Sequence, residues 1–347
     1  MGLDYRVRCC PDGLMTDRRR RVQVLDVTLR DGGLCNAWHF DEALVRDTWR
    51  ALRDAGVDVM EVGYQANESL VADRGAGPLR WSREADLRRF FESSDMRLSC
   101  MIDVGRIRVS DLRPAEDSLV DVLRIACYAH QVEEAIELCH GALDLGYDVF
   151  CNVMAVTTCS PQQVDAFLDR LRASRVRSVA VVDSYGAMYP HHLRYLIRKY
   201  KNWLRPDQQV AVHLHNNQQT AFANAIAAVE EGADWIDASV FGMGRGAGNV
   251  PLELLLMHLD DPRHDVRPVL GLLDRYVALR DELRWGYEVP YGVTGWLNQH
   301  PRAAIDRMRH SPVDPLGFYD ELVADRPRAA HHRPQREQLP VDPQTTS

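Results

Sequence analysis

Residues 147–186 read YDVFCNVMAVTTCSPQQVDAFLDRLRASRVRSVAVVDSYG, and this stretch contains the structural unit that decides the fold. Apolar, β-branched runs at 147–156 and 178–186 have the length and composition of buried strands. Between them lies PQQVDAFLDRLRAS, whose apolar residues recur with the spacing of a helix. A strand, a helix and a second strand in this order predict two parallel strands that a right-handed crossover connects.

The same alternation covers most of the chain. Eight strand-like runs occur, at residues 22–29, 57–64, 97–104, 119–128, 147–156, 178–186, 209–216 and 235–244. Helix patterns fill most of the intervals, and the crossover around 105–117 is the weakest of them. Eight strand–helix units within roughly 240 residues predict a closed (β/α)8 barrel, or TIM barrel. An open doubly wound sheet is the alternative, but the first strand–helix loop lacks the glycine-rich dinucleotide fingerprint.

The barrel is expected to occupy residues 22–261, and three further parts flank it. Residues 1–21 form an N-terminal extension, and residues 262–324 are expected to add helices after the barrel. Residues 325–347 are polar, rich in proline and poor in aromatic residues, so they predict a disordered tail.

The composition narrows the class of protein. The 347 residues include 42 basic and 50 acidic side chains, a net charge of −8, which argues against general nucleic-acid binding. No apolar run approaches the roughly 18–20 residues of a transmembrane helix, and the first residues lack the apolar core of a secretory signal. None of the eight cysteines form a C-x-x-C pair, and several lie in apolar runs, which predicts reduced thiols. We therefore expect a cytoplasmic protein that binds neither nucleic acid nor membranes.

The carboxyl ends of the strands are where a barrel of this kind gathers its functional residues. His213 and His215 are two apart on the seventh run, so their side chains point to the same face. Asp31, after the first run, can add a carboxylate, and Asn249, after the eighth, can add an amide oxygen. Nitrogen and oxygen ligands without a thiolate favour an open Mn²⁺ or Mg²⁺ site, with Zn²⁺ and Co²⁺ as alternatives. Two core histidines are the structural alternative.

Other polar residues at the strand ends predict contacts with a substrate. Arg30 is either a structural ion-pair partner of Asp31 or a guanidinium that stabilises negative charge developing on a bound oxygen. The glycine-rich loop 242–248 around Gly244 is either a tight turn or a nest for a carboxylate. Three more residues are expected to bind substrate or to orient ligands and water, namely Glu61, Asn152 and Asp183.

Three motifs in this order resemble the DRE-TIM metallolyase superfamily, the HMGL-like proteins: TLRDG at 28–32, HLHN at 213–216 and GMGRGAGN at 242–249. That group includes 4-hydroxy-2-oxovalerate aldolase, 3-hydroxy-3-methylglutaryl-CoA lyase, and the isopropylmalate and homocitrate synthases. The similarity spans about residues 22–260. Within the group, RDGGLCNAW, VDSYGAMYP and GRGAGNVPLE are most similar to proteins related to 4-hydroxy-2-oxovalerate aldolase.

The resemblance implies a metal-dependent enzyme. A divalent ion would be held by Asp31, His213 and His215, with Asn249 at the position that often completes the site, and Arg30 would stabilise an enolate oxygen. The shared chemistry makes or breaks a carbon–carbon bond beside a 2-oxo acid or thioester. We therefore expect an aldolase or lyase that acts on a pyruvate-type 2-oxo acid together with an aldehyde or acyl donor. A homo-oligomer, most simply a dimer, is expected.

The chain departs from its relatives at the position of the catalytic base. The true aldolases carry a histidine just after RDG, where this chain has Gly33 and Leu34. The synthases read RDGEQ there, and the lyases place a cysteine in the final glycine loop, which this chain lacks. The base then falls to His130, just past the fourth run, or to Tyr291 in PYGVTGW, although each residue could equally be structural.

Three rival functions follow from these departures. A Claisen-type synthase that joins an acyl-CoA to a 2-oxo acid would keep the metal and release a thiol. A non-catalytic binding barrel would need no metal ligands. A Schiff-base aldolase needs a buried lysine, and the two lysines of the chain, Lys199 and Lys201, lie in an expected surface helix.

Overall fold

The computed structural model describes residues 22–71, 75–310 and 313–324 of the chain. The expected N-terminal extension, residues 1–21, and the expected disordered tail, residues 325–347, lie outside the described residues. The division of the chain near residue 261 remains a prediction.

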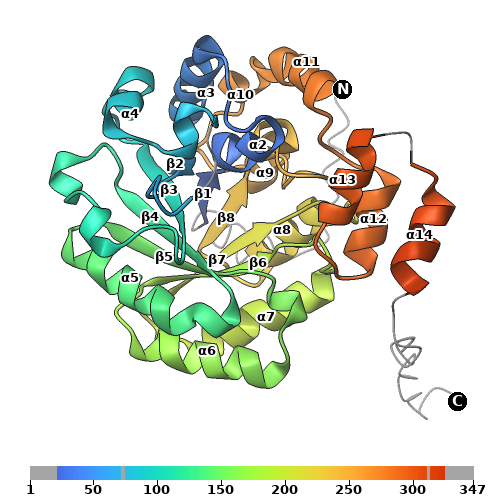
Figure 1. The fold of residues 1–347 in the computed structure, drawn as a ribbon. Helices are drawn as coiled ribbons and strands as arrows, with labels where there is room; N and C mark the ends of the chain where they lie inside the picture. The colour runs from blue at the N-terminus through green and yellow to red at the C-terminus, as the bar shows by residue number, and fades with distance from the viewer. Residues whose placement is uncertain (1–21, 72–74, 311–312, 325–347) are drawn as a thin grey trace, which may run out of the picture.

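Eight parallel strands form a closed barrel in sequence order, and β8 pairs with β1 to close it, which confirms the predicted fold (Figure 1). The strands are β1 (Gln23–Asp26), β2 (Val59–Tyr64), β3 (Arg97–Asp103), β4 (Val122–Cys127), β5 (Asp148–Val153), β6 (Ser178–Asp183), β7 (Gln209–Leu214) and β8 (Trp235–Ala238).

Helices surround the barrel, as the sequence pattern predicts (Figure 1). Asp41 caps one of them by accepting a hydrogen bond from the Leu44 backbone at 2.9 Å. Between β3 and β4, the described chain has two short 3-10 turns, Val109–Asp111 and Ala115–Asp117, and no α-helix, so the weak crossover pattern had a structural cause. The barrel helices are α2 (Thr28–Asn36), α3 (Glu42–Asp54), α4 (Glu84–Phe90), α5 (Val132–Asp144), α6 (Pro161–Ala173), α7 (Pro190–Trp203), α8 (Ala221–Glu230) and α9 (Leu252–Leu259).

The first strand is shorter than its apolar run. β1 ends at Asp26 and α2 begins at Thr28, so the expectation of a strand over 22–29 is wrong at its end. The Asp26 carboxylate accepts hydrogen bonds from the Thr28 backbone at 3.0 Å and from the Thr28 hydroxyl at 2.6 Å, which turns the chain. Arg30 and Asp31 therefore lie in the first turn of a helix rather than on a strand.

The barrel interior is filled below its mouth. One apolar cluster inside the strands includes Leu25, Phe150 and Trp235, and the rings of Phe150 and Trp235 meet edge to face at 5.2 Å. A larger cluster packs the outer face of the strands against the helices. Because the lower interior is closed by side chains, a ligand can enter only from the carboxyl ends of the strands.

The helices after the barrel pack on it in two places (Figure 1). α10 (Arg267–Leu270) and α11 (Leu273–Leu283) lie beside α3, and α12 (Val289–Trp296) lies beside the barrel mouth. α13 (Arg302–His310) and α14 (Pro315–Ala324) pack against α12. A small apolar cluster joins them to the glycine-rich loop through Ala247, Tyr291, Ala304 and Phe318.

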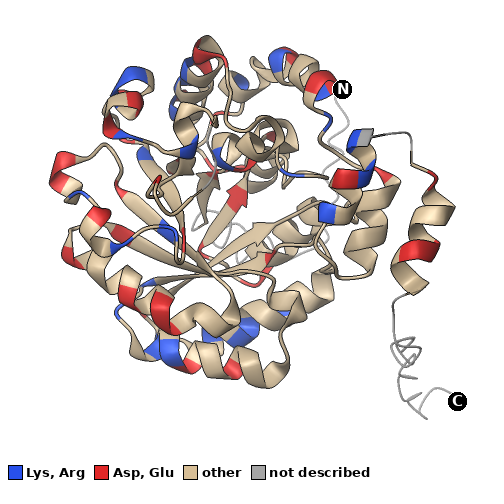
Figure 2. Ribbon diagram, in the orientation of Figure 1, with Lys and Arg blue, Asp and Glu red and all other residues tan. Residues whose placement is uncertain are grey.

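Basic and acidic residues are interspersed along the helices and loops around the barrel (Figure 2). Among the described residues, none of the helices combines the length and apolar character needed to cross a membrane.

A buried hydrogen bond between Thr48 of α3 and Tyr276 of α11 tests whether the added helices unfold with the barrel. The two oxygens are 2.7 Å apart, and both side chains are fully buried. Tyr276→Phe should lower the free energy of unfolding by about 1 kcal/mol, because one buried hydrogen bond is lost without a change of shape. Urea unfolding measures the difference. Tyr287→Phe, at a side chain that is 49% exposed, is the control, and equal losses in both variants would contradict the prediction.

Candidate metal and substrate site

Asp31, His213 and His215 meet at the mouth of the barrel. Their ligand atoms all lie within 4.8 Å of one another, and all three side chains are buried. Asp31 comes from the first turn of α2, His213 lies on β7 and His215 directly follows it. One carboxylate and two imidazoles this close together form a set that can hold a divalent ion.

The ring of His213 is oriented by a carboxylate behind it. His213 Nδ1 lies 2.8 Å from Asp237 Oδ2, which leaves Nε2 as the ligand atom. Burial raises the pKa of Asp237, but Arg124 and His213 outweigh burial and hold the pKa below its usual value. The carboxylate therefore stays charged, and it keeps the proton of His213 on Nδ1.

The ring of His215 is held in a similar way by the backbone. His215 Nδ1 lies 3.2 Å from the Gly248 carbonyl oxygen, which can only accept, so the proton sits on Nδ1 and Nε2 carries the lone pair. Burial lowers the pKa of His215 well below its ordinary value, although Asp31 opposes this shift. The imidazole is therefore neutral, the form that binds a metal.

Asn249 completes one side of this group. Its Nδ2 donates to Asp31 Oδ2 at 2.9 Å and to the Met243 carbonyl at 3.0 Å. Its Oδ1 is buried without a hydrogen-bond partner among the described residues, so this oxygen could bind a cation. A Cβ atom on Gly244 would lie 2.5 Å from Asp31 Oδ2, so the close approach of the loop requires glycine there.

A chain of buried charged side chains runs through the barrel interior and links Asp31 to His213, two members of the group that can hold a metal ion. Arg124 donates to Asp237 at 2.6 Å and to Glu61 at 3.2 Å. Glu61 also accepts from Arg30 Nε at 2.6 Å, and Arg30 Nη1 donates to Asp31 at 2.7 Å. The sequence predicted a role for Glu61 but gave no indication of Arg124, which is wholly buried in β4.

Arg30 makes the ion pairs of the structural role and keeps one donor that could serve the other role. Its ion pairs with Glu61 and Asp31 fix the guanidinium plane, and its Nη2 is buried without a partner in the described part of the chain. Burial alone would lower the pKa of Arg30, but the negative charges of Glu61 and Asp31 outweigh burial and raise this pKa well above its ordinary value. The positive charge is therefore permanent. A fixed cation with one spare donor at the cavity wall is suited to a developing oxyanion.

A cavity of about 90 Å³ opens beside these residues, which is room for a small molecule. Asn152 lines it, and Asn152 Oδ1 is buried with no partner in the described ranges. The wall combines polar residues with an apolar side that includes Leu34. The remaining lining residues include Tyr64, Met101, Tyr128, Met154, Val182, Ser184, Tyr185, Arg245 and His300.

Other predicted site residues lie elsewhere. Asp183 shapes the loop after β6, because it accepts from the backbones of Ala187 and Met188, each at 2.9 Å. Burial raises the pKa of Asp183 to about 6. The exposed ring of His130 stacks on Tyr128 and lines a separate hollow beside α5 and α6. In the part of the chain that the structure describes, His130 therefore does not lie beside Asp31, His213 and His215.

Tyr291 lies behind the glycine-rich loop. Its ring is buried in α12, and a Cβ atom on Gly246 would come within 3.2 Å of it. Burial raises the pKa of Tyr291 to about 12, so the phenol keeps its proton.

Sequence reasoning missed two basic residues of the cavity wall, Arg245 and His300. Arg245 stands inside the glycine-rich motif that had been singled out, so the motif held a signal that was overlooked. His300 follows α12 in a stretch without any motif, and only the packing of α12 beside the mouth brings it to the cavity.

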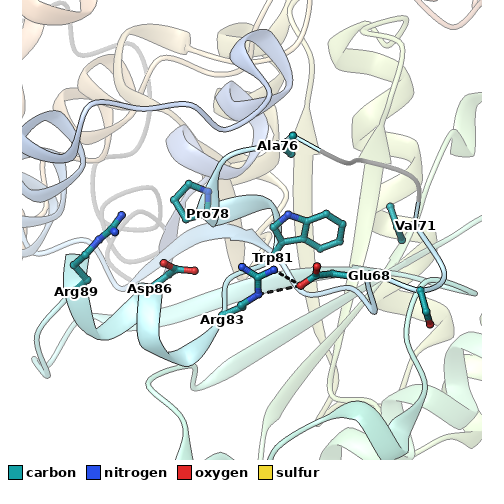
Figure 3. Close-up of a pocket in the computed structure, with 10 residues that line it drawn as sticks. Glu68, Val71, Ala76, Pro78, Trp81, Arg83, Asp86 and Arg89 are labelled. Carbon is teal, nitrogen blue, oxygen red and sulfur yellow. Dashed lines mark hydrogen bonds and ion pairs between the residues drawn. The ribbon is translucent and has the colours of Figure 1, made fainter.

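A larger hollow of about 750 Å³ lies outside this group, over the connection from β2 to α4 (Figure 3). An ion pair between Arg83 and Glu68 crosses it, and Trp81, Asp86 and Arg89 form parts of its wall. Glu68, Arg83 and Arg89 are exposed to water and Asp86 is half-buried, unlike the buried groups at the barrel mouth.

The fold and the site define a (β/α)8-barrel protein with a buried Asp-His-His group of the kind that holds a divalent metal. Residues 21–272 match the model of the HMGL-like family, and the chain belongs to this family.

Named relatives and solved structures agree with this assignment. The chain is 34% identical over 322 residues to 4-hydroxy-2-oxovalerate aldolase of Roseiflexus sp. (strain RS-1), covering 86% of this chain and 90% of that protein. It is 30% identical over 290 residues to an oxaloacetate decarboxylase of Mycobacterium tuberculosis, covering 82% of each. The N-terminal domain of a candidate aldolase from Bacteroides vulgatus superposes with a TM-score of 0.75 at 28% identity, covering 84% of this chain and 97% of that one. HMG-CoA lyase from Brucella melitensis shares the fold, with a TM-score of 0.63 at 20% identity, covering 76% and 99%.

The carboxylate behind His213 should control metal affinity. Asp237→Asn should weaken Mn²⁺ binding by about 10- to 100-fold, because an amide no longer fixes the proton of His213 on Nδ1. Titration of Mn²⁺ into the purified protein measures the change. Asp207→Asn, at a side chain that is 57% exposed in the loop before β7, is the matched control. Equal affinities in the two variants would remove Asp237 from the site.

Proposed function

We propose that the protein is a divalent-metal-dependent aldolase, a carbon–carbon lyase that acts on a small 2-oxo acid. The observation that carries the proposal is the fixed Arg30 guanidinium beside the buried group of Asp31, His213 and His215. Its relatives named 4-hydroxy-2-oxovalerate aldolase support the choice within the family.

The metal would be Mn²⁺ or Mg²⁺, with Zn²⁺ or Co²⁺ as alternatives, held by Asp31, His213, His215 and Asn249 Oδ1. A bound ion supplies Lewis-acid polarisation to a 2-oxo acid. Arg30 Nη2 presents a permanent charge to the oxygen that becomes an enolate when the carbon–carbon bond breaks.

The charges at this end of the barrel support an anionic substrate. Within the chain of ion pairs and the adjoining Arg245, three cations and three anions cancel, namely Arg30, Arg124, Arg245, Asp31, Glu61 and Asp237. A divalent ion would add two positive charges to this neutral group. The dianion formed when a 2-oxo acid becomes its enolate would restore neutrality, so the site favours that charge state over the single negative charge of the substrate.

Proton transfer is assigned to Tyr291 rather than His130. Neither residue is among those that line the cavity, but Tyr291 lies against the loop that carries Arg245, whereas His130 faces a different hollow. Because its phenol is protonated, Tyr291 acts as the acid that protonates the alkoxide when the carbon–carbon bond forms. Asn152 and Gly244 contact the substrate from the wall and the loop, and Asp183 orients the loop after β6.

The second substrate is an aldehyde in this proposal. Cleavage of a 2-oxo dicarboxylate to carbon dioxide and the same enolate is a second candidate, favoured by the relative named oxaloacetate decarboxylase. An acyl donor, as in a Claisen-type synthase, is the remaining alternative.

We further propose a cytoplasmic dimer. The six cysteines in the described residues are free and at least partly buried, which suits a reducing compartment. Tyr195 and Trp296 are 59% and 53% exposed and line one hollow between α7 and α12, which suits contact with a second copy.

Exchange of protons between pyruvate and solvent tests the proposal without knowledge of the aldehyde. An enzyme that stabilises the enolate should exchange the methyl protons of pyruvate in D₂O, because exchange needs only the 2-oxo acid, the ion, Arg30 and a base. Proton NMR follows the methyl signal over hours. Exchange should require Mn²⁺ or Mg²⁺, stop with EDTA and disappear in His215→Ala.

Two outcomes of the exchange experiment would contradict the proposed aldolase function. Thiol release from an acyl-CoA plus a 2-oxo acid, without exchange of pyruvate or 2-oxobutyrate, would establish the synthase instead. Exchange that persists in metal-free protein would separate the chemistry from the Asp31–His213–His215 group.

Arg30→Lys tests the role of the guanidinium. Lysine keeps the charge but loses the planar fork, so the exchange rate should fall by about 10²-fold, as for loss of one oxyanion donor. The melting temperature should change little. Arg113→Lys, at an exposed side chain, is the matched control. A large loss of stability, with unchanged exchange per folded molecule, would show that Arg30 is purely structural.

A further inference from the structure

Arg245 extends from the glycine-rich loop to Asp31 and His215, two of the three residues that can hold a metal ion. Its backbone N–H donates to Asp31 Oδ2 at 3.1 Å, which ties the loop to a ligand, and its side chain lines the cavity. Arg245 therefore adds a second cation to the same cavity wall as Arg30.

The guanidinium of Arg245 is poorly satisfied by its surroundings. Nη2 donates to the Ser184 carbonyl oxygen at 2.8 Å and lies 3.4 Å from His215 Nε2, a weak contact. Nε is buried without a hydrogen-bond partner in the residues that the structure describes. Five N–H donors on a half-buried side chain thus make one good hydrogen bond to an oxygen, so the group has donors to spare for an anion.

His300 does not supply a hydrogen-bond acceptor for the Arg245 guanidinium. The Arg302 backbone donates to His300 Nδ1 at 3.0 Å, so the proton of a neutral ring must sit on Nε2. His300 Nε2 lies 3.0 Å from Arg245 Nη1, which places one donor against another. Burial, and then the charge of Arg245, lower the pKa of His300 to about 4, so the ring stays neutral. The contact therefore does not hold the guanidinium in place.

Arg245 also lies where the ion would need to bind. Because His215 Nδ1 faces the Gly248 carbonyl, the lone pair on Nε2 is the one available to a metal. Arg245 Nη2 approaches that same nitrogen. A guanidinium and a divalent cation repel one another at this distance, so they compete for His215 Nε2.

We propose that Arg245 binds the carboxylate of the 2-oxo acid, and that its guanidinium leaves His215 Nε2 for this carboxylate when the divalent ion takes that nitrogen. The inference rests on the proposed function and assigns a substrate-binding residue within it. The planar fork of arginine matches the two oxygens of a carboxylate. A carboxylate between Arg245 and the divalent ion would attract both, whereas the two cations alone repel one another.

Two titrations on Arg245→Gln test the proposal, because they should change in opposite directions. Mn²⁺ affinity, measured by paramagnetic resonance without any 2-oxo acid, should rise about threefold or more as the competing cation is removed. Pyruvate affinity of the Mn²⁺-loaded protein, measured by calorimetry, should fall about tenfold or more as a charge-assisted hydrogen bond is lost. Arg245→Lys should show an intermediate loss of pyruvate affinity, since it keeps the charge without the fork.

Arg302→Gln is the matched control, because its exposed side chain lies near His300 and carries the same charge. It should leave both affinities within about twofold of the wild type. Unchanged or weaker Mn²⁺ binding in Arg245→Gln would overturn the competition, and unchanged pyruvate binding would overturn the carboxylate assignment. If the Mn²⁺-loaded wild type fails to bind pyruvate, the proposed function fails and the inference fails with it. If the wild type binds pyruvate and Arg245→Gln binds it equally well, the inference fails alone.

Discussion

A continuous chain of buried ion pairs runs from Asp237 through Arg124, Glu61 and Arg30 to Asp31, and the organisation of the site depends on it. Burial of a charge is costly unless a partner of opposite sign and good geometry compensates it. In this barrel Arg124, Glu61, Asp237 and Arg30 each pair with a neighbour on another strand or helix, and Asp31 pairs with Arg30 of its own helix. The positions of these side chains are therefore set together.

This constraint connects stability with chemistry. The carboxylate of Asp237 faces both Arg124 and His213, and Asp31 faces both Arg30 and Asn249. Removing one partner from a buried pair leaves an uncompensated charge at a cost of about 3–5 kcal/mol. The side chains of this network thus orient the imidazole of His213 and the carboxylate of Asp31, while the Gly248 carbonyl orients His215.

The mouth of the barrel is completed by parts of the chain that are distant in sequence. The loop 242–249 reaches Asp31 through the Arg245 backbone and the Asn249 side chain, and α12 supports the loop from behind through Tyr291. The helices after the barrel therefore help to shape the cavity. His300 belongs to the cavity wall for the same reason, although it follows the end of β8 by some sixty residues in the printed sequence.

Local periodicity and motif spacing were enough to predict the barrel, and they placed His213 and His215 on one face because strand side chains alternate. They could not locate the end of β1, because the apolar run continues through Val27 while the Asp26 side chain turns the backbone.

The tertiary structure alone decided which residues meet across the barrel. The pairing of Arg124 with Asp237, the approach of Arg245 and His300 to the cavity, and the position of His130 outside it depend on barrel closure and loop packing. Sequence patterns report the face on which a side chain lies within one element. They carry no information on contacts between elements separated by a hundred residues, since those are set by the packing of the whole barrel.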